Sequence, residues 1–123
     1  EIGWILYAPC IQRTCIGTEA MYLIINYAFE SRHFRRVEWK CNAANQPSRN
    51  AALRYGFQFE GVFRQHMIVR GMNRDSAWFS VLDGEWEAYV KKGFVDWLDA
   101  GNFSADGRQM STMQELRQVK SND

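Results

Sequence analysis

The sequence predicts an α/β domain with a mixed sheet, whose elements follow the order β-α-β-α-β-β before a C-terminal helix. Its 123 residues are enough for one hydrophobic core and too few for two independent ones. The apolar content of 46% and the aromatic content of 15% argue against a disordered chain. Stretches with strand-like patterning alternate with stretches of helical periodicity, and this alternation predicts the fold class.

The first part of the chain is typical of a strand, a helix and a second strand. Residues 1–8 are apolar and aromatic and precede Pro9, which predicts a buried strand. A helix is expected over 17–30, where the apolar residues share one face: Met21, Ile24, Ile25, Ala28 and Phe29. After a basic turn, residues 37–41 alternate apolar and polar as a strand does. The short connections make this a βαβ unit, so we expect parallel strands with a right-handed crossover.

The middle of the chain predicts a helix followed by a hairpin. The helix spans 46–55, with Asn45 as N-cap, Pro47 in the first turn and Gly56 at the end. Strands are expected over 57–69 and 75–82, joined by a loop that contains Gly71 and Asn73. The large aromatic residues of the strands are expected in the core: Trp4, Trp39, Trp78 and Phe79.

The last part returns to helical periodicity. A helix is expected over 85–98, with one apolar side formed by Trp86, Tyr89, Val90, Gly93, Phe94 and Trp97. Residues 100–109 are rich in Gly, Asn and Asp and predict a loop. A short amphipathic turn is expected after it, formed by Met113, Leu116 and Val119, and the chain is expected to fray over 121–123.

Composition argues against several classes of function. The net charge of +1 gives no strong positive field, so a general nucleic-acid binder is disfavoured. The sequence contains neither a membrane-spanning stretch nor a signal-peptide pattern, which favours a cytoplasmic protein. Cys10, Cys15 and Cys41 are too few for a disulfide scaffold and indicate a reducing compartment. A zinc site with His33 as fourth ligand is disfavoured because no CxxC pair exists, so we expect no metal.

The loop before the first helix is a candidate anion site. Residues 12–20 lie between a predicted strand and a predicted helix, where backbone N–H groups lack intrahelical partners. These groups and the positive end of the helix dipole suit a pyrophosphate, and Arg13 adds a full positive charge. The alternative is an ordinary strand-to-helix loop that carries a surface arginine.

The same loop resembles the acyl-CoA pyrophosphate loop of the GNAT superfamily of N-acetyltransferases, whose pattern is Gln/Arg-x-x-Gly-x-Gly/Ala. Gln12 and Gly17 match its first and last positions, and Cys15 stands at the first glycine. Residues 45–57 are similar to the Asn-x-x-Ser…Gly-Phe signature of the family's fourth helix. The hairpin residues 60–64, Gly71 and 74–75 resemble the RimJ/RimL-like subgroup, which acetylates N-terminal amines of ribosomal proteins.

The resemblance implies a donor site for acetyl-CoA. Residues 1–8 would correspond to the family's fourth strand, which diverges from the fifth strand (37–41) and opens a V-shaped cleft for the pantetheine arm. The pantetheine would pair with main-chain groups between Ile5 and Tyr7, and Asn45 would bind one of its amides. The implied cofactor-binding residues are Ile5, Tyr7, Gln12, Arg13, Thr14, Cys15, Ile16, Gly17, Thr18, Asn45 and Ser48.

The resemblance also implies a direct attack of an amine on the thioester. Ser48 matches the RimL-like serine and would stabilise the departing sulfur, although a first-turn serine also serves as a helix cap. Many members have a tyrosine four residues before the helix-ending glycine; here that position is Ala52, so Tyr55 is not assigned the acid role. Glu1 would be the general base, with Glu60, His66 and Asp75 as alternatives. The acceptor would be a protein N-terminus or a small amine.

The resemblance covers residues 1–86 as a partial acetyl-CoA-binding core, with 87–123 as a C-terminal helix and tail. A whole GNAT domain has three strands and two helices before this part, so we expect a C-terminal portion of the fold. An exposed edge on the first strand would favour a homodimer. Two alternatives stay open: a degenerate relative that binds CoA without turnover, and an interaction module that uses the basic cluster Arg32, Arg35 and Arg36.

Overall fold

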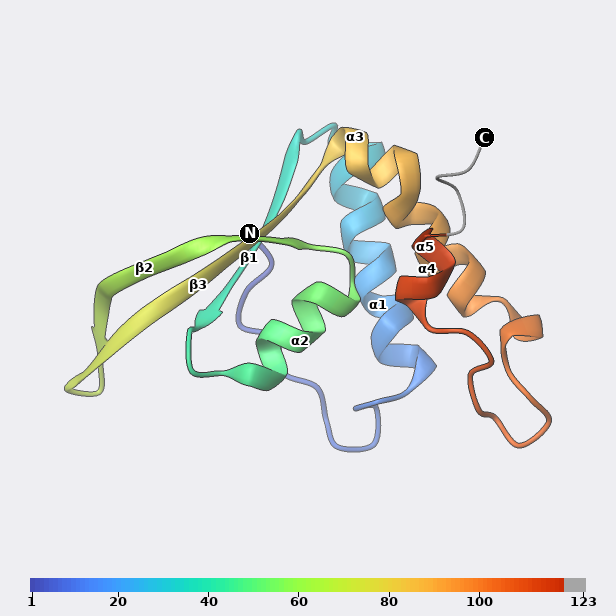
Figure 1. Ribbon diagram of the computed structural model, residues 1–123, viewed down its shortest axis with the longest axis horizontal. Coiled ribbons are helices and arrows are strands. Elements are labelled where there is room, and N and C mark those ends of the chain that lie inside the picture. Colours follow the sequence, from blue (N-terminus) through green and yellow to red (C-terminus); the bar gives the residue numbers. More distant parts are fainter. Residues whose placement is uncertain (119–123) are drawn as a thin grey trace. The chain divides into compact units, whose positions relative to one another are not determined.

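The structure, a computed structural model, describes residues 1–118 and divides into two compact units (Figure 1). The first unit combines Glu1–Ile5 with Arg36–Leu82 and contains the sheet. The second combines Leu6–Arg35 with the described residues from Asp83 to Gln118 and contains the other helices. The sequence predicted a different division, with a partial acetyl-CoA-binding core over 1–86 and a C-terminal helix and tail over 87–123. That division describes how far the family resemblance extends, and it stays a prediction.

The sheet of the first unit has three antiparallel strands in the order β1-β3-β2. The strands are β1 (Arg36–Asn42), β2 (Gln58–Val69) and β3 (Met72–Leu82). Trp39 of β1 lies opposite Phe79 of β3, and the residues on this face are buried: Val37, Trp39, Cys41, Ala77, Phe79 and Val81. This alternation confirms the core positions predicted for Trp39 and Phe79, while Trp78 on the opposite face is half-buried.

The hairpin between β2 and β3 is tighter than the sequence indicated. Only Arg70 and Gly71 separate the strands, and both have positive φ angles, +52° and +77°. Two consecutive left-handed residues form a type I′ turn, whose twist matches that of the flanking strands. The loop expected over 70–74 is therefore wrong, and β3 begins at Met72 instead of Asp75. The register of β2 also shifts between Phe59 and Gly61 and again between Phe63 and Met67.

The helix α2 (Gln46–Arg54) confirms the predicted start and end signals. The Asn45 side chain accepts a hydrogen bond from the backbone N of Ser48 at 3.1 Å, and Pro47 occupies the first turn. Gly56 follows the helix with a φ of +93°, a conformation that favours glycine. Next to α2, the Trp39 ring contacts Tyr55 and Phe57 at centroid distances of 6.1 and 5.7 Å.

The predicted buried strand over 1–8 is wrong, except at one position. Ile2 forms a parallel bridge with Trp39, and its N–H donates to the Glu38 carbonyl at 2.9 Å, which agrees with the predicted strand direction. The pairing ends there because Trp4 has a φ of +55°, which an extended strand does not allow. Trp4 and Leu6 are exposed instead of buried, so Trp4 is not a core aromatic. The exposed strand edge that was expected to favour a homodimer therefore does not extend beyond Ile2. Dimerisation itself stays a prediction.

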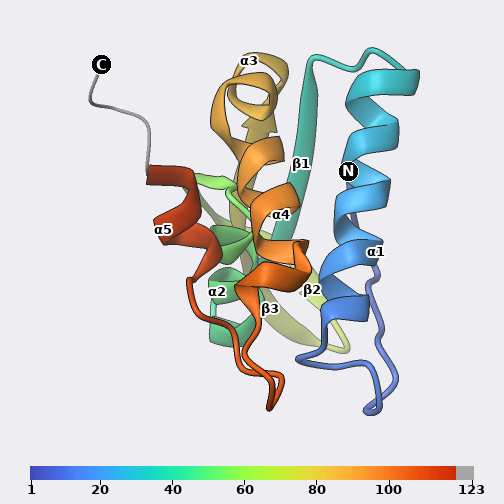
Figure 2. The same cartoon turned by 90° about the vertical axis from the view of Figure 1, so that its right-hand side faces the viewer.

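The helical unit contains α1 (Cys15–Asn26), α3 (Asp83–Glu85), α4 (Lys91–Leu98) and α5 (Met113–Gln118). A π-helical turn, Tyr27–Ser31, extends α1, and another, Trp86–Val90, joins α3 to α4. Figures 1 and 2 show α1 and α4 side by side. Their core is aromatic, since Trp86 contacts Phe29 at 5.5 Å and Phe94 at 6.0 Å between ring centroids. The predicted apolar faces are confirmed at the residues that are buried, namely Met21, Ile25, Phe29, Trp86, Val90, Gly93, Phe94 and Trp97.

Some helix details differ from the sequence prediction. α1 begins at Cys15, two residues before the expected start, and Ile24 is half exposed. The expected loop over 100–109 contains a short 3₁₀ turn, Ala100–Asn102, and a bridge between Phe103 and Gln109. The predictions for Val119 and for 121–123 fall outside the described residues. Within residues 1–118, no helix combines the length and apolar character that crossing a bilayer requires.

Candidate functional site

A pocket of about 370 Å³ opens in the first unit where the N-terminal segment leaves β1. Because the parallel pairing stops at Ile2, the backbone of residues 3–5 separates from the strand, and side chains of β1 and α2 form the opposite wall. Four of the predicted site residues line this pocket: Glu1, Ile5, Asn45 and Ser48. The sequence predicted a cleft between diverging strands, and the pocket lies at that place, although one of its sides is an irregular segment.

Ser48 reaches the pocket from the first turn of α2 and is half-buried. Its hydroxyl Oγ accepts a hydrogen bond from the indole Nε1 of Trp39 at 3.1 Å. Its backbone N–H donates to the Asn45 cap, so the serine backbone is fixed by the helix start. The hydroxyl is therefore held at the pocket wall by β1 and by α2 together.

Asn45 caps α2 and lines the same pocket. The capping bond uses the side-chain oxygen Oδ1, which accepts from Ser48 N. The amide Nδ2 is a separate donor group and is not part of the cap. One side chain thus has the groups for both predicted roles, helix capping and donation to a ligand carbonyl.

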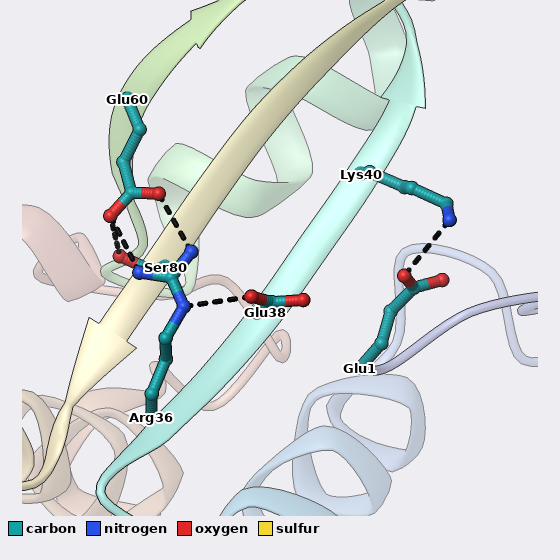
Figure 3. Close-up of polar contacts among 6 residues, drawn as sticks. All are labelled: Glu1, Arg36, Glu38, Lys40, Glu60 and Ser80. Atoms are coloured by element: carbon teal, nitrogen blue, oxygen red, sulfur yellow. Dashed lines mark hydrogen bonds and ion pairs between the residues drawn. The ribbon is translucent and has the colours of Figure 1, made fainter. Parts of the chain in front are cut away.

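Glu1 lies at the pocket with its carboxylate Oε2 3.1 Å from Nζ of Lys40 (Figure 3). The Lys40 ammonium also lies 5.1 Å from the ring centroid of Trp78, a cation–π distance. The predicted base is therefore paired with the Lys40 ammonium, and an incoming substrate ammonium would compete with Lys40 for the Glu1 carboxylate.

The alternative bases on the hairpin have other partners. Glu60 accepts two hydrogen bonds from the Arg36 guanidinium and one from the Ser80 hydroxyl, each 2.7 Å long (Figure 3). Arg36 first, and then Ser80, lowers the pKa of Glu60 to about 2, which makes it a poor proton acceptor. The pKa of Asp75 is also lowered, first by the backbone N–H of Gln65. These contacts indicate a structural role for both carboxylates.

His66, the remaining alternative base, contacts Ser76 through Nδ1 at 2.9 Å. Its ring also lies edge-on to Phe63 and to Trp78, at centroid distances of 5.5 and 6.0 Å. His66 does not line the pocket that contains Glu1 and Ser48. Among the predicted bases, Glu1 is the one at that pocket.

The predicted pyrophosphate loop belongs to the helical unit and forms the start of α1. Thr14 precedes the helix in an extended conformation, and its hydroxyl donates to the Ile11 carbonyl at 2.7 Å instead of capping the helix. Within residues 1–118, the amides of Cys15, Ile16 and Gly17 have no hydrogen-bond acceptor. A helix start without a side-chain cap is the arrangement that binds anionic groups in proteins.

The side chains of the loop differ in their exposure. Gln12, Arg13, Cys15 and Ile16 are exposed, while Gly17 and Thr18 are buried. Arg13 has a φ of +59°, so the chain turns sharply before α1. The Gln12 side chain donates to the Tyr7 carbonyl at 2.9 Å, and this carbonyl belongs to the segment predicted to pair with pantetheine.

Gly17 is required by a close approach of the preceding segment. The Tyr7 hydroxyl donates to the Gly17 carbonyl at 2.9 Å. A Cβ at position 17 would lie 3.2 Å from Cε2 of Tyr7 and 3.3 Å from the Ile11 carbonyl oxygen. The glycine of the motif therefore lets the tyrosine and the loop backbone pack against α1.

Lys40, Arg74 and Trp39 also line the pocket but were not predicted as site residues. Trp39 was correctly placed in the core, and its hydrogen bond to Ser48 was not foreseen. Lys40 follows Trp39 in a strand with alternating burial, so the sequence predicts that Lys40 lies on the opposite face of the sheet. The sequence contains no signal for its ion pair with Glu1. As for metals, the described part of the chain contains no cluster of three His, Cys, Asp or Glu side chains suited to an ion.

Comparison with known proteins points to one family. Residues 1–58 match the family described as an acetyltransferase (GNAT) domain. YdaF of Bacillus subtilis (strain 168), which is named as a candidate ribosomal N-acetyltransferase, is 39% identical over 88 residues. That alignment covers 71% of this chain and 47% of YdaF.

Solved structures give the same picture. A GCN5-related N-acetyltransferase from Brucella melitensis is 51% identical with a TM-score of 0.91, over 94% of this chain and 52% of that one. The microcin C7 self-immunity acetyltransferase MccE, in complex with acetyl-CoA and AMP, is 30% identical with a TM-score of 0.56, over 63% and 43% of the two chains. The chain spans about half the length of the relatives it matches.

Proposed function

Because this chain belongs to the GNAT acetyltransferase family, we propose that it moves an acetyl group from acetyl-CoA to a primary amine by direct attack. The observation that carries the proposal is the pocket beside β1, which brings Glu1, Asn45 and Ser48 to one place. These side chains have the chemistry of a proton acceptor, an amide donor and a hydroxyl donor. The candidate acceptors are a protein N-terminus and a small amine, and the name of YdaF, a candidate ribosomal N-acetyltransferase, favours a ribosomal target over a small amine.

The donor site needs groups for a pyrophosphate and for an amide-bearing arm. The unpaired amides of Cys15, Ile16 and Gly17, with the exposed guanidinium of Arg13, fit an anionic phosphate group. Nδ2 of Asn45 and the backbone near Ile5 suit the pantetheine amides. We assign the same residues that the sequence predicted to this site, with Gln12, Thr14, Tyr7 and Thr18 shaping its loop.

Transfer requires a proton acceptor and a group that stabilises the leaving sulfur. Acetyl-CoA supplies the thioester, whose carbon forms a bond to the amine nitrogen while its bond to sulfur breaks. Glu1 takes a proton from the substrate ammonium, which makes the nitrogen nucleophilic. Ser48 stabilises the departing thiolate with a hydrogen bond from its hydroxyl, and the second proton of the amine nitrogen passes to that sulfur as the amide forms. Lys40 forms an ion pair with the Glu1 carboxylate, so the Lys40 side chain moves aside when the ammonium group of the acceptor binds there.

A second candidate function is CoA binding without turnover. It is favoured by Cys15, which stands at the first glycine of the family's loop pattern, and by the ion pair that occupies Glu1. In this case Ser48 and Asn45 would bind the ligand, and no amine would be acetylated. Turnover, and not binding, separates the two candidates.

The test combines binding and turnover on the same chain. We expect calorimetric titration with CoA to show saturable binding, and thiol release from acetyl-CoA to depend on an added amine. The amine panel should contain peptides with free N-termini, the same peptides with blocked N-termini, and small amines. Binding without thiol release would support the second candidate, and an absence of CoA binding would contradict both. Light scattering of the same sample tests the predicted homodimer.

A further inference from the structure

The contact between Trp39 and Ser48 joins the buried sheet face to the pocket. The Trp39 side chain is buried, with 6% of the residue exposed, and its Nε1 lies 3.1 Å from Oγ of Ser48. Both residues line the pocket. The contact therefore connects a buried strand residue to the hydroxyl at the pocket wall.

The direction of this hydrogen bond follows from the chemistry of the two groups. An indole Nε1–H is a donor only, whereas a serine hydroxyl has one hydrogen to donate and two lone pairs to accept with. In this contact Ser48 must therefore be the acceptor, and its own hydrogen points elsewhere. Among residues 1–118 no acceptor is found for that hydrogen.

We propose that Trp39 is a positioning residue, which turns the Ser48 hydroxyl so that its hydrogen is donated to a sulfur atom bound in the pocket. The inference rests on the proposed function, because the sulfur is that of CoA. The inference gives Trp39, a residue of the buried sheet face, a role in orienting the site. Trp39 acts through Ser48 and does not itself donate a hydrogen bond to the ligand. Ser48 without this contact would rotate among its staggered conformations and donate for only part of the time.

A purely structural explanation is that the bond only satisfies a buried indole. The same sheet offers a comparison, because Nε1 of Trp78 is buried and has no partner within the described residues. A buried indole in this unit is therefore not always paired with a protein group. The pairing of Trp39 with the one hydroxyl predicted to face the thioester sulfur is thus a specific feature of the pocket.

The experiment measures how readily the thiol of bound CoA ionises. Donation from Ser48 stabilises the thiolate, so it lowers the pKa of the bound thiol. The ultraviolet absorbance of the thiolate reports this pKa when pH is varied at saturating CoA, and it needs no turnover. The variants are Trp39→Phe, Ser48→Ala and the double variant, all of which keep the charged pocket residues Glu1, Lys40 and Arg74.

Trp97→Phe is the matched control. Trp97 is as buried as Trp39, with 5% of the residue exposed, and its Nε1 donates to Gln109 at 2.8 Å in the helical unit. The change thus removes an equivalent indole hydrogen bond from a residue that does not line the pocket. We expect no change in the thiolate titration of this variant.

We expect Ser48→Ala to lower the thiolate fraction at a given pH by about tenfold and Trp39→Phe by about threefold, as for the loss of one hydrogen bond. The double variant should behave as Ser48→Ala does. A Trp39→Phe effect that persists in the Ser48→Ala background would overturn the inference, as would an equal effect of Trp97→Phe. If CoA does not bind the unaltered chain, the proposed function itself has failed.

A second measurement covers the case in which Trp39→Phe does not fold. In the unaltered protein, the indole N–H resonance of Trp39 should follow the titration of the bound thiol, because Ser48 links the two groups. The Trp97 resonance should stay constant over the same pH range. A Trp39 resonance that ignores the thiol titration would contradict the inference without any variant.

Discussion

Arg36 and Glu60 lie 24 residues apart in sequence and bind each other through two parallel N–H···O bonds of 2.7 Å (Figure 3). Replacing Glu60 with glutamine should lower the free energy of unfolding at neutral pH. The side chains are 34% and 42% exposed, so solvent screening limits the loss to about 1 kcal/mol. Urea denaturation measures it, and Glu19→Gln removes the same charge at an exposed position as the control. An equal loss in both variants would show that net charge, and not the paired geometry, is responsible.

The same pair predicts a dependence of stability on acid. The pKa of Glu60 is about 2 in the folded chain, below its ordinary value of 4.5, because Arg36 and Ser80 donate to the carboxylate. The stabilisation is therefore complete above about pH 4.5 and is lost as the pH falls toward 2. The difference in stability between the unaltered chain and Glu60→Gln should shrink over this range. A difference that stays constant down to pH 2 would contradict the lowered pKa.

Two substitutions of Asn45 separate its capping role from ligand binding. Asn45→Ala removes the oxygen that accepts from Ser48 N, and we expect a loss of about 1 kcal/mol in stability. Asn45→Asp keeps an accepting oxygen at the helix start but removes the Nδ2 donor, so stability should be retained. Calorimetry with CoA should show weaker binding for both variants. Unchanged binding by Asn45→Asp would mean that the residue serves only as a cap.

Gly17→Ala tests whether the start of α1 tolerates a methyl group. The new Cβ would lie 3.2 Å from Tyr7 and 3.3 Å from the Ile11 carbonyl, so the loop must shift, at a cost of about 1 kcal/mol. Thermal unfolding should show the loss, and CoA affinity should fall with it because the loop amides move. Gly84→Ala is the control, since nothing lies within 4 Å of the added atom there. Equal stability of the two variants would contradict the close packing described for Tyr7.

Thiol reactivity tests the loop at the start of α1. Cys10 and Cys15 are exposed and Cys41 is buried, so two thiols should react rapidly with a disulfide reagent and the third only after unfolding. Saturating CoA should slow the reaction of Cys15, because we propose that the amides of residues 15–17 bind the pyrophosphate. Cys10→Ser isolates the protected thiol, and Cys15→Ser isolates the unprotected one. Full reactivity of Cys15 at saturating CoA would exclude this loop from the binding site.

Local signals in the sequence predicted much of the fold correctly. Both ends of α2 were predicted from residues that act within a few positions of the helix, namely Asn45, Pro47 and Gly56. The alternation around Trp39 likewise predicted β1 and the buried face of the sheet. Such features depend on neighbours along the chain, which is why one sequence is enough to find them.

Features that depend on distant partners were missed. The apolar run over 1–8 suggested a buried strand, but a buried strand needs a neighbouring strand along its whole length, and within this run the pairing with β1 is limited to Ile2. Glu60 was considered as a base because nothing local revealed Arg36, which fixes its charge. In the candidate site, Ser48 and Asn45 were found through a motif, whereas Lys40 and Arg74 belong to no motif and join the pocket only through folding.

The left-handed conformation of Trp4 ends the pairing between the N-terminal segment and β1, and it therefore controls how far the two backbones diverge. β-Branched residues resist such a conformation, so Trp4→Val would favour an extended segment and additional hydrogen bonds to the strand. Glycine or asparagine at the same position would keep the opening. The backbone conformation at position 4 thus sets where this wall of the pocket leaves β1, and substitutions there test whether the opening depends on that conformation.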